Sequence, residues 1–216
     1  YKGQPPVRYF STAIRHITRC GNKLTPVQEL ELSTLLVLYI VRTDSDSMLL
    51  YEIIKDVMNI CKNKLQLHKW HANDQFASKK LRLFWCVYLL ERMICVAVGK
   101  PYTIHENEIE VPFFDENSFF THSTFNTSSP RRSGVHFINQ SLKLRRIESH
   151  FVEVLKILPA TERRTNNKSE IEKQLPVVKR AFHELELWRA GCLSNELRNF
   201  ENETLKLYYY RSVRLL

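Results

Sequence analysis

Apolar residues recur every three or four positions along most of the chain, which is the spacing of amphipathic helices. The first such run covers residues 7–17 and is followed by Gly21, a residue type that commonly ends helices. The second run, residues 27–41, is preceded by Thr25, which can form a capping box with Gln28. The N-terminal part of the chain is therefore predicted to form two helices.

A short polar link at residues 43–47 separates the second run from a third, which covers residues 51–65. Since so short a connection places consecutive helices side by side, residues 27–65 are predicted to form an antiparallel helical hairpin.

In a helix over residues 78–98, apolar side chains would cover nearly the whole circumference, a pattern typical of a helix that is buried on most sides. Gly99 and Pro101 follow it directly and predict its end. The apolar residues that define the pattern are Leu81, Phe84, Trp85, Tyr88, Met93, Ile94 and Ala97.

The next stretch, residues 100–134, is rich in helix breakers and turn formers and divides into two parts. In residues 103–114 apolar and acidic residues alternate, which predicts an ordered segment. Residues 115–134 are rich in Ser, Thr and Asn and are predicted to form a mobile loop.

Three further helices are predicted in the C-terminal part: one over residues 135–158, one from Ser169 to Gly191 with a kink at Pro176, and a last one that reaches Leu216. Within the middle helix, apolar residues spaced 4, 3, 4 and 3 apart predict a seam for a neighbouring helix. The seam residues are Ile171, Leu175, Val178, Phe182 and Leu185.

The composition agrees with a helical fold. Only 5 of the 216 residues are glycine, and no Asn-Gly or Asp-Gly pair is present to close a tight hairpin, which disfavours β-sandwiches, barrels and Gly-rich phosphate loops. No apolar run approaches the ~20 residues that cross a bilayer. The sequence predicts an all-α domain, an irregular multi-helix bundle with an antiparallel helical hairpin and one central buried helix. Residues 1–216 are expected to be part of a longer protein, because the last helix has no cap.

The formal net charge of +9 raises the possibility of a polyanionic partner. The basic residues fall in doublets along the whole chain, such as Lys79–Lys80 and Arg145–Arg146, with acidic residues between them. A solvated surface is therefore the favoured interpretation, and an anionic-ligand site is the alternative. Salt-sensitive, sequence-independent binding is all that is expected between this chain and DNA.

Recognisable catalytic chemistry is missing from the sequence. It contains no G-x-S-x-G, H-E-x-x-H or G-x-G-x-x-G motif, and its five cysteines are widely spaced, as is typical of reduced core residues. His68 and His71 could share a metal, but only Asp74 is near enough in sequence to be a third ligand, so polar residues that close a helix are the favoured interpretation. No catalytic residue and no metal site are predicted, and the chain is expected not to be an enzyme.

Glu91 and Arg92 stand out because they lie inside the predicted buried helix, where an unpaired charge costs several kcal/mol. Arg92 is therefore predicted to be buried in a structural ion pair. Its candidate partners are Glu91 and, in the segment that follows, Glu108 or Glu110. A catalytic role for either charge is the minor alternative.

The same stretch resembles a known family. Residues 80–92 read K-L-R-L-F-W-C-V-Y-L-L-E-R, followed by V-G-K-P at 98–101 and I-E-V-P at 109–112. This succession is similar to the middle homology region of the fungal zinc-cluster transcription factors, and the resemblance covers about residues 27–216.

The resemblance implies a regulatory, effector-sensing domain of a nuclear factor that controls RNA polymerase II transcription. Glu91 and Lys100 stand where the family more often has Asp and Arg, which are conservative changes. The family's DNA-binding part, a cysteine cluster that holds zinc, is not in this chain, so DNA and zinc are expected to bind outside it. The alternative, which the resemblance also allows, is a helical interaction scaffold such as a centromere-complex subunit. A small-molecule effector or a transcriptional co-regulator is the expected partner, a homodimer is a further option, and no membrane contact is expected.

An effector site is hypothesised beside the central helix, roofed by residues 103–114. Aromatic walls would suit an apolar xenobiotic or a fatty acid, whereas the basic charge balance would suit an anionic nucleotide such as NADP(H). The residues assigned to this site are Trp85, Tyr88, Arg92, Phe151 and Trp188.

Overall fold

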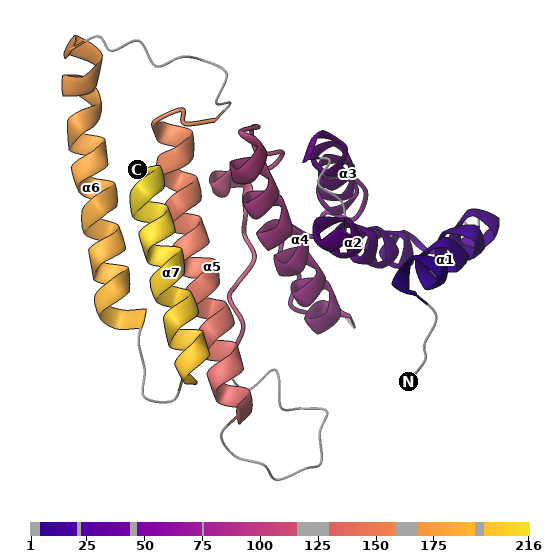
Figure 1. The fold of residues 1–216 in the computed structure, drawn as a ribbon. Helices are drawn as coiled ribbons and strands as arrows, with labels where there is room; N and C mark the ends of the chain where they lie inside the picture. Colours follow the sequence, from indigo (N-terminus) through magenta and orange to yellow (C-terminus); the bar gives the residue numbers. More distant parts are fainter. Residues whose placement is uncertain are drawn as a thin grey trace.

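A computed structural model describes residues 5–20, 23–43, 47–74, 76–115, 130–158, 168–192 and 197–216. All regular structure in these ranges is helical: seven α-helices, together with a π-helix and a 3-10 helix (Figure 1). The predicted all-α class is confirmed. Among the described residues, no helix combines the length and the apolar character needed to cross a bilayer.

The first two helices follow the sequence pattern closely. Helix α1 covers Pro6–Cys20 and α2 covers Pro26–Thr43. The predicted capping box is present before α2: the amide of Thr25 donates to Oε1 of Gln28 at 3.0 Å, and the amide of Gln28 donates to Oγ1 of Thr25 at 3.4 Å. Two of the backbone donors at the start of this helix are thereby satisfied.

Helix α3 covers Ser47–Asn59 and continues into the π-helix η2, Ile60–Lys64. It packs against α2, so the predicted antiparallel hairpin is confirmed (Figure 1). The sequence pattern ran to residue 65 without a change of period, and the widening to a π-helix over the last turn was not predicted.

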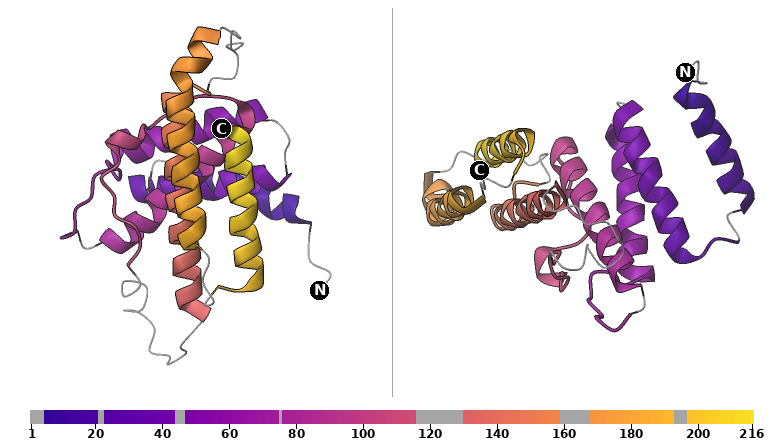
Figure 2. Two further views of the ribbon diagram at one scale, coloured as in Figure 1. Left: turned by 90° about the vertical axis from the view of Figure 1, so that its left-hand side faces the viewer. Right: turned by 90° about the horizontal axis from the view of Figure 1, so that it is seen from below.

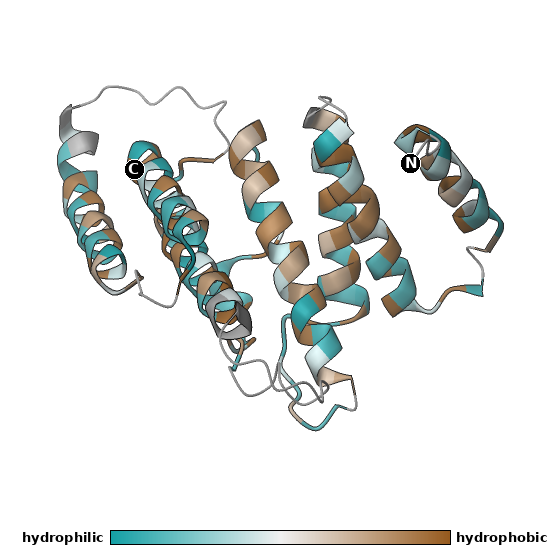
Figure 3. Cartoon of the chain, turned by 60° about the horizontal axis from the view of Figure 1, so that its bottom comes forward, coloured by the Kyte–Doolittle hydropathy of each residue, from teal (hydrophilic) through white to brown (hydrophobic). Residues whose placement is uncertain are grey.

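Helix α4, Ala77–Val98, lies between the hairpin and the C-terminal helices. Eleven of its 22 residues are buried, and Figure 3 shows it largely in the colours of apolar residues. Gly99 ends it with φ at 72°, and the amides of Gly99 and Lys100 both donate to the carbonyl of Cys95. The predicted central buried helix and its glycine stop are both confirmed. Glycine is suited to this position because it adopts the left-handed conformation without strain.

Residues 100–115 cross from α4 to α5 as a mainly irregular segment that includes the 3-10 helix η3, Glu106–Glu108. Of the predicted mobile loop 115–134, residues 116–129 lie outside the described residues. Residues 130–134 belong to α5, so this part of the prediction is wrong. The helix starts earlier because Pro130 suits a first helical turn, where its missing N–H is not needed.

Helices α5 (Pro130–Val154), α6 (Lys168–Cys192) and α7 (Asn199–Leu215) pack against one another as a three-helix group (Figure 2). Pro176 lies inside α6, and the kink expected there stays a prediction. The helix ends one residue beyond Gly191, the predicted stop.

The apolar seam predicted on α6 is confirmed only in part, because Leu185 is buried and Val178 packs against the core, whereas two other seam residues are exposed. Leu175 is 46% exposed and Phe182 is 44% exposed, whereas Ala181, Leu185 and Trp188 are buried. The buried stripe is therefore rotated around the helix from the predicted one. The cause is that Trp188 anchors α6 on α5, and a small Ala181 permits the close approach that the bulkier Phe182 would hinder.

Candidate functional site

A network of charged and polar groups lies inside the protein, between α4, the segment after it and α5. Glu91 and Arg92, neighbours on α4, are both fully buried. Nη1 of Arg92 donates to Oε2 of Glu91 at 2.6 Å. The predicted burial of Arg92 and its pairing with Glu91 are thus confirmed.

Glu106 is the second carboxylate that faces Arg92. Its Oε1 accepts hydrogen bonds from Nη2 of Arg92 at 3.1 Å and from the hydroxyl of Tyr88 at 2.6 Å. Its Oε2 accepts a hydrogen bond from Nε of Arg146, on α5, at 3.1 Å. One buried carboxylate therefore joins the central helix to the C-terminal helices.

The network also holds the backbone of the segment that follows α4. Oε1 of Glu91 accepts a hydrogen bond from the amide of Thr103 at 2.6 Å. Nη2 of Arg92 donates to the carbonyl of Ile104 at 2.8 Å. The two charges therefore satisfy buried backbone groups as well as each other, which is the condition under which buried ions are tolerated.

Two tyrosines enclose the arginine. The ring centroids of Tyr88 and Tyr102 lie 4.5 and 4.1 Å from the central guanidinium carbon of Arg92, a cation–π arrangement. Desolvation alone would lower the pKa of Arg92, but Tyr88, Glu91 and Glu106 outweigh it and the pKa is raised. Burial raises the pKa of the Tyr88 phenol, which therefore stays a hydrogen-bond donor.

The other two predicted partners of Arg92 lie elsewhere, so that prediction is wrong. Glu108 pairs with Nζ of Lys62, on η2, at 2.7 Å. The side chain of Glu110 is exposed, and its amide donates to the carbonyl of His68 at 2.9 Å. The 3-10 turn separates Glu106 from Glu108, because residues two apart in such a turn point to different sides. Glu110 lies beyond the turn, where its backbone is bonded to His68.

The residues assigned to an effector site are all core residues. Nε1 of Trp85 donates to the carbonyl of Pro112 at 2.9 Å, and its ring stacks on Phe113. Nε1 of Trp188 donates to the carbonyl of Gln140, on α5, at 3.0 Å. Both indole N–H groups are therefore used inside the protein.

The structure brings only part of that set together. Trp85, Tyr88 and Arg92 are neighbours on α4, but Trp188 meets α5 at Gln140, which is about 16 Å along the helix axis from Phe151. In this conformation each of the five side chains packs against protein atoms, with at most 7% of its surface exposed. The hypothesised effector site stays a prediction.

A separate hollow, the α2–α4 groove, has a volume of about 490 Å³. Leu35 and Leu38, on its α2 side, are 60% and 38% exposed. Its volume lies in the range of small-molecule sites. The groove is lined by Leu24, Gln28, Glu31, Leu32, Thr34, Leu35, Leu38, Leu83 and Cys86.

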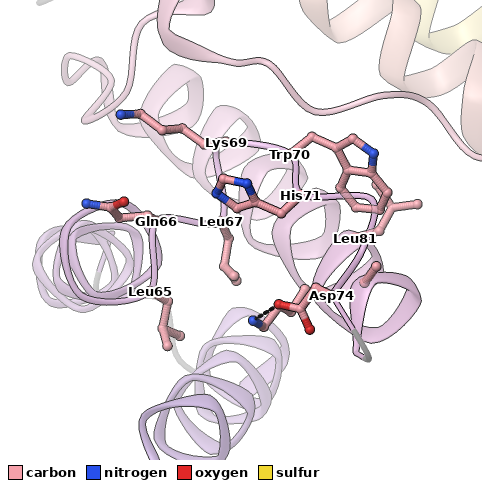
Figure 4. Close-up of a pocket in the computed structure, with 10 residues that line it drawn as sticks. Leu65, Gln66, Leu67, Lys69, Trp70, His71, Asp74 and Leu81 are labelled. Carbon is pink, nitrogen blue, oxygen red and sulfur yellow. Dashed lines mark hydrogen bonds and ion pairs between the residues drawn. The ribbon is translucent and has the colours of Figure 1, made fainter.

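A smaller hollow, of about 30 Å³, lies before the start of α4 (Figure 4). Asp74 and Lys80 form an ion pair at its edge, and the hydrogen bond from Lys80 lowers the pKa of the Asp74 carboxyl. A space of this size holds little more than a water molecule.

The two histidines considered as metal ligands lie at this end of the molecule. His68 is buried, its Nδ1 has no hydrogen-bond partner among the described residues, and burial lowers its pKa. His71 is exposed and lines the small hollow. Within the described ranges, no three His, Cys, Asp or Glu side chains are grouped so as to hold a metal ion.

Comparison with known proteins assigns the chain to a family. The model of the fungal specific transcription factor domain matches residues 5–190. The chain belongs to this family.

Two relatives from Saccharomyces cerevisiae agree with this assignment. The chain is 64% identical over its whole length to the uncharacterized transcriptional regulatory protein YLR278C. It is 31% identical to pyrimidine pathway regulatory protein 1 over 154 residues, 66% of the chain. The chain spans 16% and 15% of these two relatives' lengths. No solved structure matches it.

The motifs that resemble this fungal transcription factor family have structural roles. Residues 80–92 form most of α4, Gly99 ends that helix, and residues 109–112 fold back so that Pro112 accepts the hydrogen bond from Trp85. The residues that carry the resemblance therefore form the central helix of the domain and hold the segment after it in place.

A second buried network, between α5 and α7, was not predicted from the sequence. Nη1 of Arg145 contacts both carboxylate oxygens of Glu148, at 2.7 and 2.8 Å, and Ser212 of α7 donates to the same carboxylate at 2.7 Å. The basic doublets, Arg145–Arg146 among them, are predicted to lie on a solvated surface, and for Arg145 this prediction is wrong because the residue is buried. A signal was present, because Glu148 stands three residues after Arg145 and so on the same helix face.

The five cysteines are free. Cys61, Cys95 and Cys192 are buried, in agreement with the predicted core role, but Cys20 is exposed and Cys86 is partly exposed. Burial raises the pKa of Cys61 and of Cys95 to about 12, so these two thiols stay protonated.

Proposed function

We propose that this domain is the effector-sensing regulatory region of a fungal zinc-cluster transcription factor. It acts in the nucleus, on RNA polymerase II transcription, and the parent protein binds DNA and zinc through a segment outside these 216 residues. Membership of the family supports regulation rather than catalysis. The observation that carries the sensing proposal is the apolar α2–α4 groove.

The chemistry of the groove favours an apolar effector, such as a xenobiotic or a fatty acid. Most of its lining side chains are leucines, with few charged groups to bind an anion. Arg92, the cation hypothesised to attract a nucleotide such as NADP(H), is already paired with Glu91 and Glu106. A phosphate would have to displace two buried carboxylates to reach it.

The groove and the buried network share one helix. Leu83 and Cys86 line the groove, and Tyr88 and Arg92 follow them within three turns of α4. A ligand in the groove contacts both α2 and α4. Helix α4 also carries the charges that hold residues 100–115 and α5. Such a ligand shifts the position of α4 relative to the C-terminal helices only if it binds one position more tightly than another. The size of the shift is set by that difference in affinity.

Thermal unfolding in the presence of fatty acids, azole drugs, acyl-CoA esters and NADP(H) tests the proposal. At 100 times its dissociation constant a ligand adds about 2.7 kcal/mol, which raises the melting temperature of a domain of this size by roughly 5–10 °C. Leu35→Asp should abolish the shift for an apolar ligand. Leu207→Asp, at an exposed position on α7, is the matched control and should leave the shift unchanged.

Cys86 provides a native reporter for the same site. An occupied groove should slow alkylation of Cys86, which lines it, and leave alkylation of the exposed Cys20 unchanged. A ligand that shifts the melting temperature without protecting Cys86 would place the effector site elsewhere.

The second candidate function is an interaction scaffold, as in a centromere-complex subunit. It is favoured by the exposure of Leu35 and Leu38, one turn apart on α2, which a co-regulator's helix would cover more fully than a small molecule. In that case no small molecule protects Cys86, whereas a bound co-regulator does. Sedimentation of the free domain decides whether a second copy is the partner, because a homodimer has twice the monomer mass.

A further inference from the structure

The charge of this protein is concentrated at one end. The first 28 residues contain five Lys or Arg residues and no Asp or Glu, and Glu29 is the first acid in the chain. More than half of the net charge of +9 therefore belongs to about an eighth of the sequence. This excess was not evident from the basic doublets, which lie in later parts of the chain.

Three of these cations form one stripe on α1. Arg8, Arg15 and Arg19 are separated by seven and four residues, so they lie on one helix face, about 10 and 6 Å apart along the axis. All three are exposed. No carboxylate of the described residues forms an ion pair with Arg15 or Arg19, in contrast to Lys64 and Lys79, which pair with acids of α2.

The stripe faces away from the rest of the protein. Phe10 stacks on Tyr39 of α2 with ring centroids 4.0 Å apart, so the side of α1 that carries Phe10 is turned toward α2. The three arginines lie about 140–180° around the helix from Phe10. Helix α1 occupies one end of the molecule, beside α2 and far from α6, so its outer face is open to a large partner (Figures 1 and 2).

The chemistry of this face favours phosphate over the alternatives. A membrane-surface helix would need its apolar side, and the side of α1 that carries Phe10 is turned toward α2. A protein interface is usually centred on a cluster of aromatic or apolar anchors, whereas a single exposed aromatic, Tyr9, lies beside these arginines together with Thr12 and His16. Exposed arginine forks in a row can bind successive phosphates of a nucleic-acid backbone, and Arg15 and Arg19 have no carboxylate partner among the described residues to compete with a phosphate.

We propose that the outer face of α1 binds the phosphate backbone of duplex DNA without sequence preference. It would add an electrostatic contact to the DNA that the parent protein recognises through another segment. The proposal does not depend on effector sensing, because α1 does not line the α2–α4 groove.

Binding of the 216-residue protein to two unrelated 24-base-pair duplexes, followed by fluorescence anisotropy between 50 and 200 mM salt, tests it. The variant Arg8→Gln/Arg15→Gln/Arg19→Gln should reduce the slope of log affinity against log salt by about 2–3 for both duplexes. The matched control, Lys173→Gln/Lys179→Gln/Arg214→Gln, removes three exposed charges from α6 and α7 and should leave the slope nearly unchanged. Circular dichroism and the melting temperature establish that each variant is folded.

Three outcomes would overturn the proposal. An equal reduction of the salt slope in both triple variants would show that DNA responds to the total charge of the protein and not to the stripe. Unchanged DNA binding by the α1 variant would exclude the stripe. Loss of binding to polyglutamate or to phosphatidylserine vesicles with DNA binding intact would assign the stripe to an acidic protein or to a membrane surface.

Discussion

Arg92 and Arg146 are 54 residues apart and share one carboxylate, that of Glu106, which presents Oε1 to the first and Oε2 to the second. Arg92 belongs to the central helix and Arg146 to the C-terminal three-helix group. Because one buried acid presents an oxygen to each of the two arginines, its carboxylate links the central helix to the C-terminal group. The domain is therefore expected to unfold as one cooperative unit.

Removal of the arginine should be severely destabilising. Arg92→Met leaves Glu91 and Glu106 buried without their common partner, and a broken buried pair costs about 3–5 kcal/mol. Urea unfolding of the variant measures this loss. Arg180→Met is the control, because its ion pair with Glu184 is exposed and contributes about 0–1 kcal/mol. A loss below about 0.5 kcal/mol for Arg92→Met would contradict the burial of the pair.

Two glutamates of one segment should differ sharply in their effect on stability. Glu106→Gln removes the charge that faces Arg92 and Arg146 and should cost about 2–3 kcal/mol in the free energy of unfolding. Glu110→Gln, at an exposed position that the sequence analysis proposed as a partner of Arg92 while it overlooked Glu106, should change it by less than about 0.5 kcal/mol. Equal effects of the two substitutions would mean that the segment has a different register on α4.

The contrast between Glu106 and Glu110 shows what the sequence could predict. Helix positions and the need to pair Arg92 followed from local rules, namely helical periodicity and the cost of a buried charge. Which acid meets the arginine depends on the path of an irregular segment with a single 3-10 turn, and no periodic pattern encodes that path.

The same limit explains the errors on α6 and at Arg145. Periodicity showed that α6 is amphipathic, but the choice between Phe182 and the small Ala181 as the buried residue is made by the neighbouring helices. Arg145 is buried only because Glu148 and Ser212, a residue 67 positions later in the chain, complete its surroundings. Tertiary partners of this kind are not visible in local spacing.

Two glycines should respond to alanine in opposite directions. Gly99→Ala places a side chain at φ 72°, where L-residues are strained, and should lower the free energy of unfolding by about 1 kcal/mol. Gly134 lies within α5, and an added Cβ there meets no atom within 4 Å among the described residues. Gly134→Ala should therefore raise the free energy of unfolding by about 0.5–1 kcal/mol. Chemical denaturation of both variants checks the signs, and stabilisation by Gly99→Ala would contradict the left-handed helix end.

Stability should fall in acid through the pairing of Glu108. The carboxylate accepts hydrogen bonds from Lys62 and from the amide of His105, and these hold the pKa of Glu108 below its ordinary value of 4.5. A lowered folded-state pKa means that the unfolded chain takes up the proton first as the pH falls. The stabilisation is therefore present above about pH 4.5 and is lost as the pH drops through the lower, folded-state pKa.

The expected result is a decrease in the urea midpoint between pH 5.5 and pH 3.5 that is smaller in Glu108→Gln than in the parent protein, because the amide cannot titrate. Glu203→Gln, which removes an exposed acid paired with Lys206 on α7, is the control and should retain the parent's pH dependence. If Glu108→Gln loses stability in acid as steeply as the parent protein, the contact between Lys62 and Glu108 does not contribute to folding.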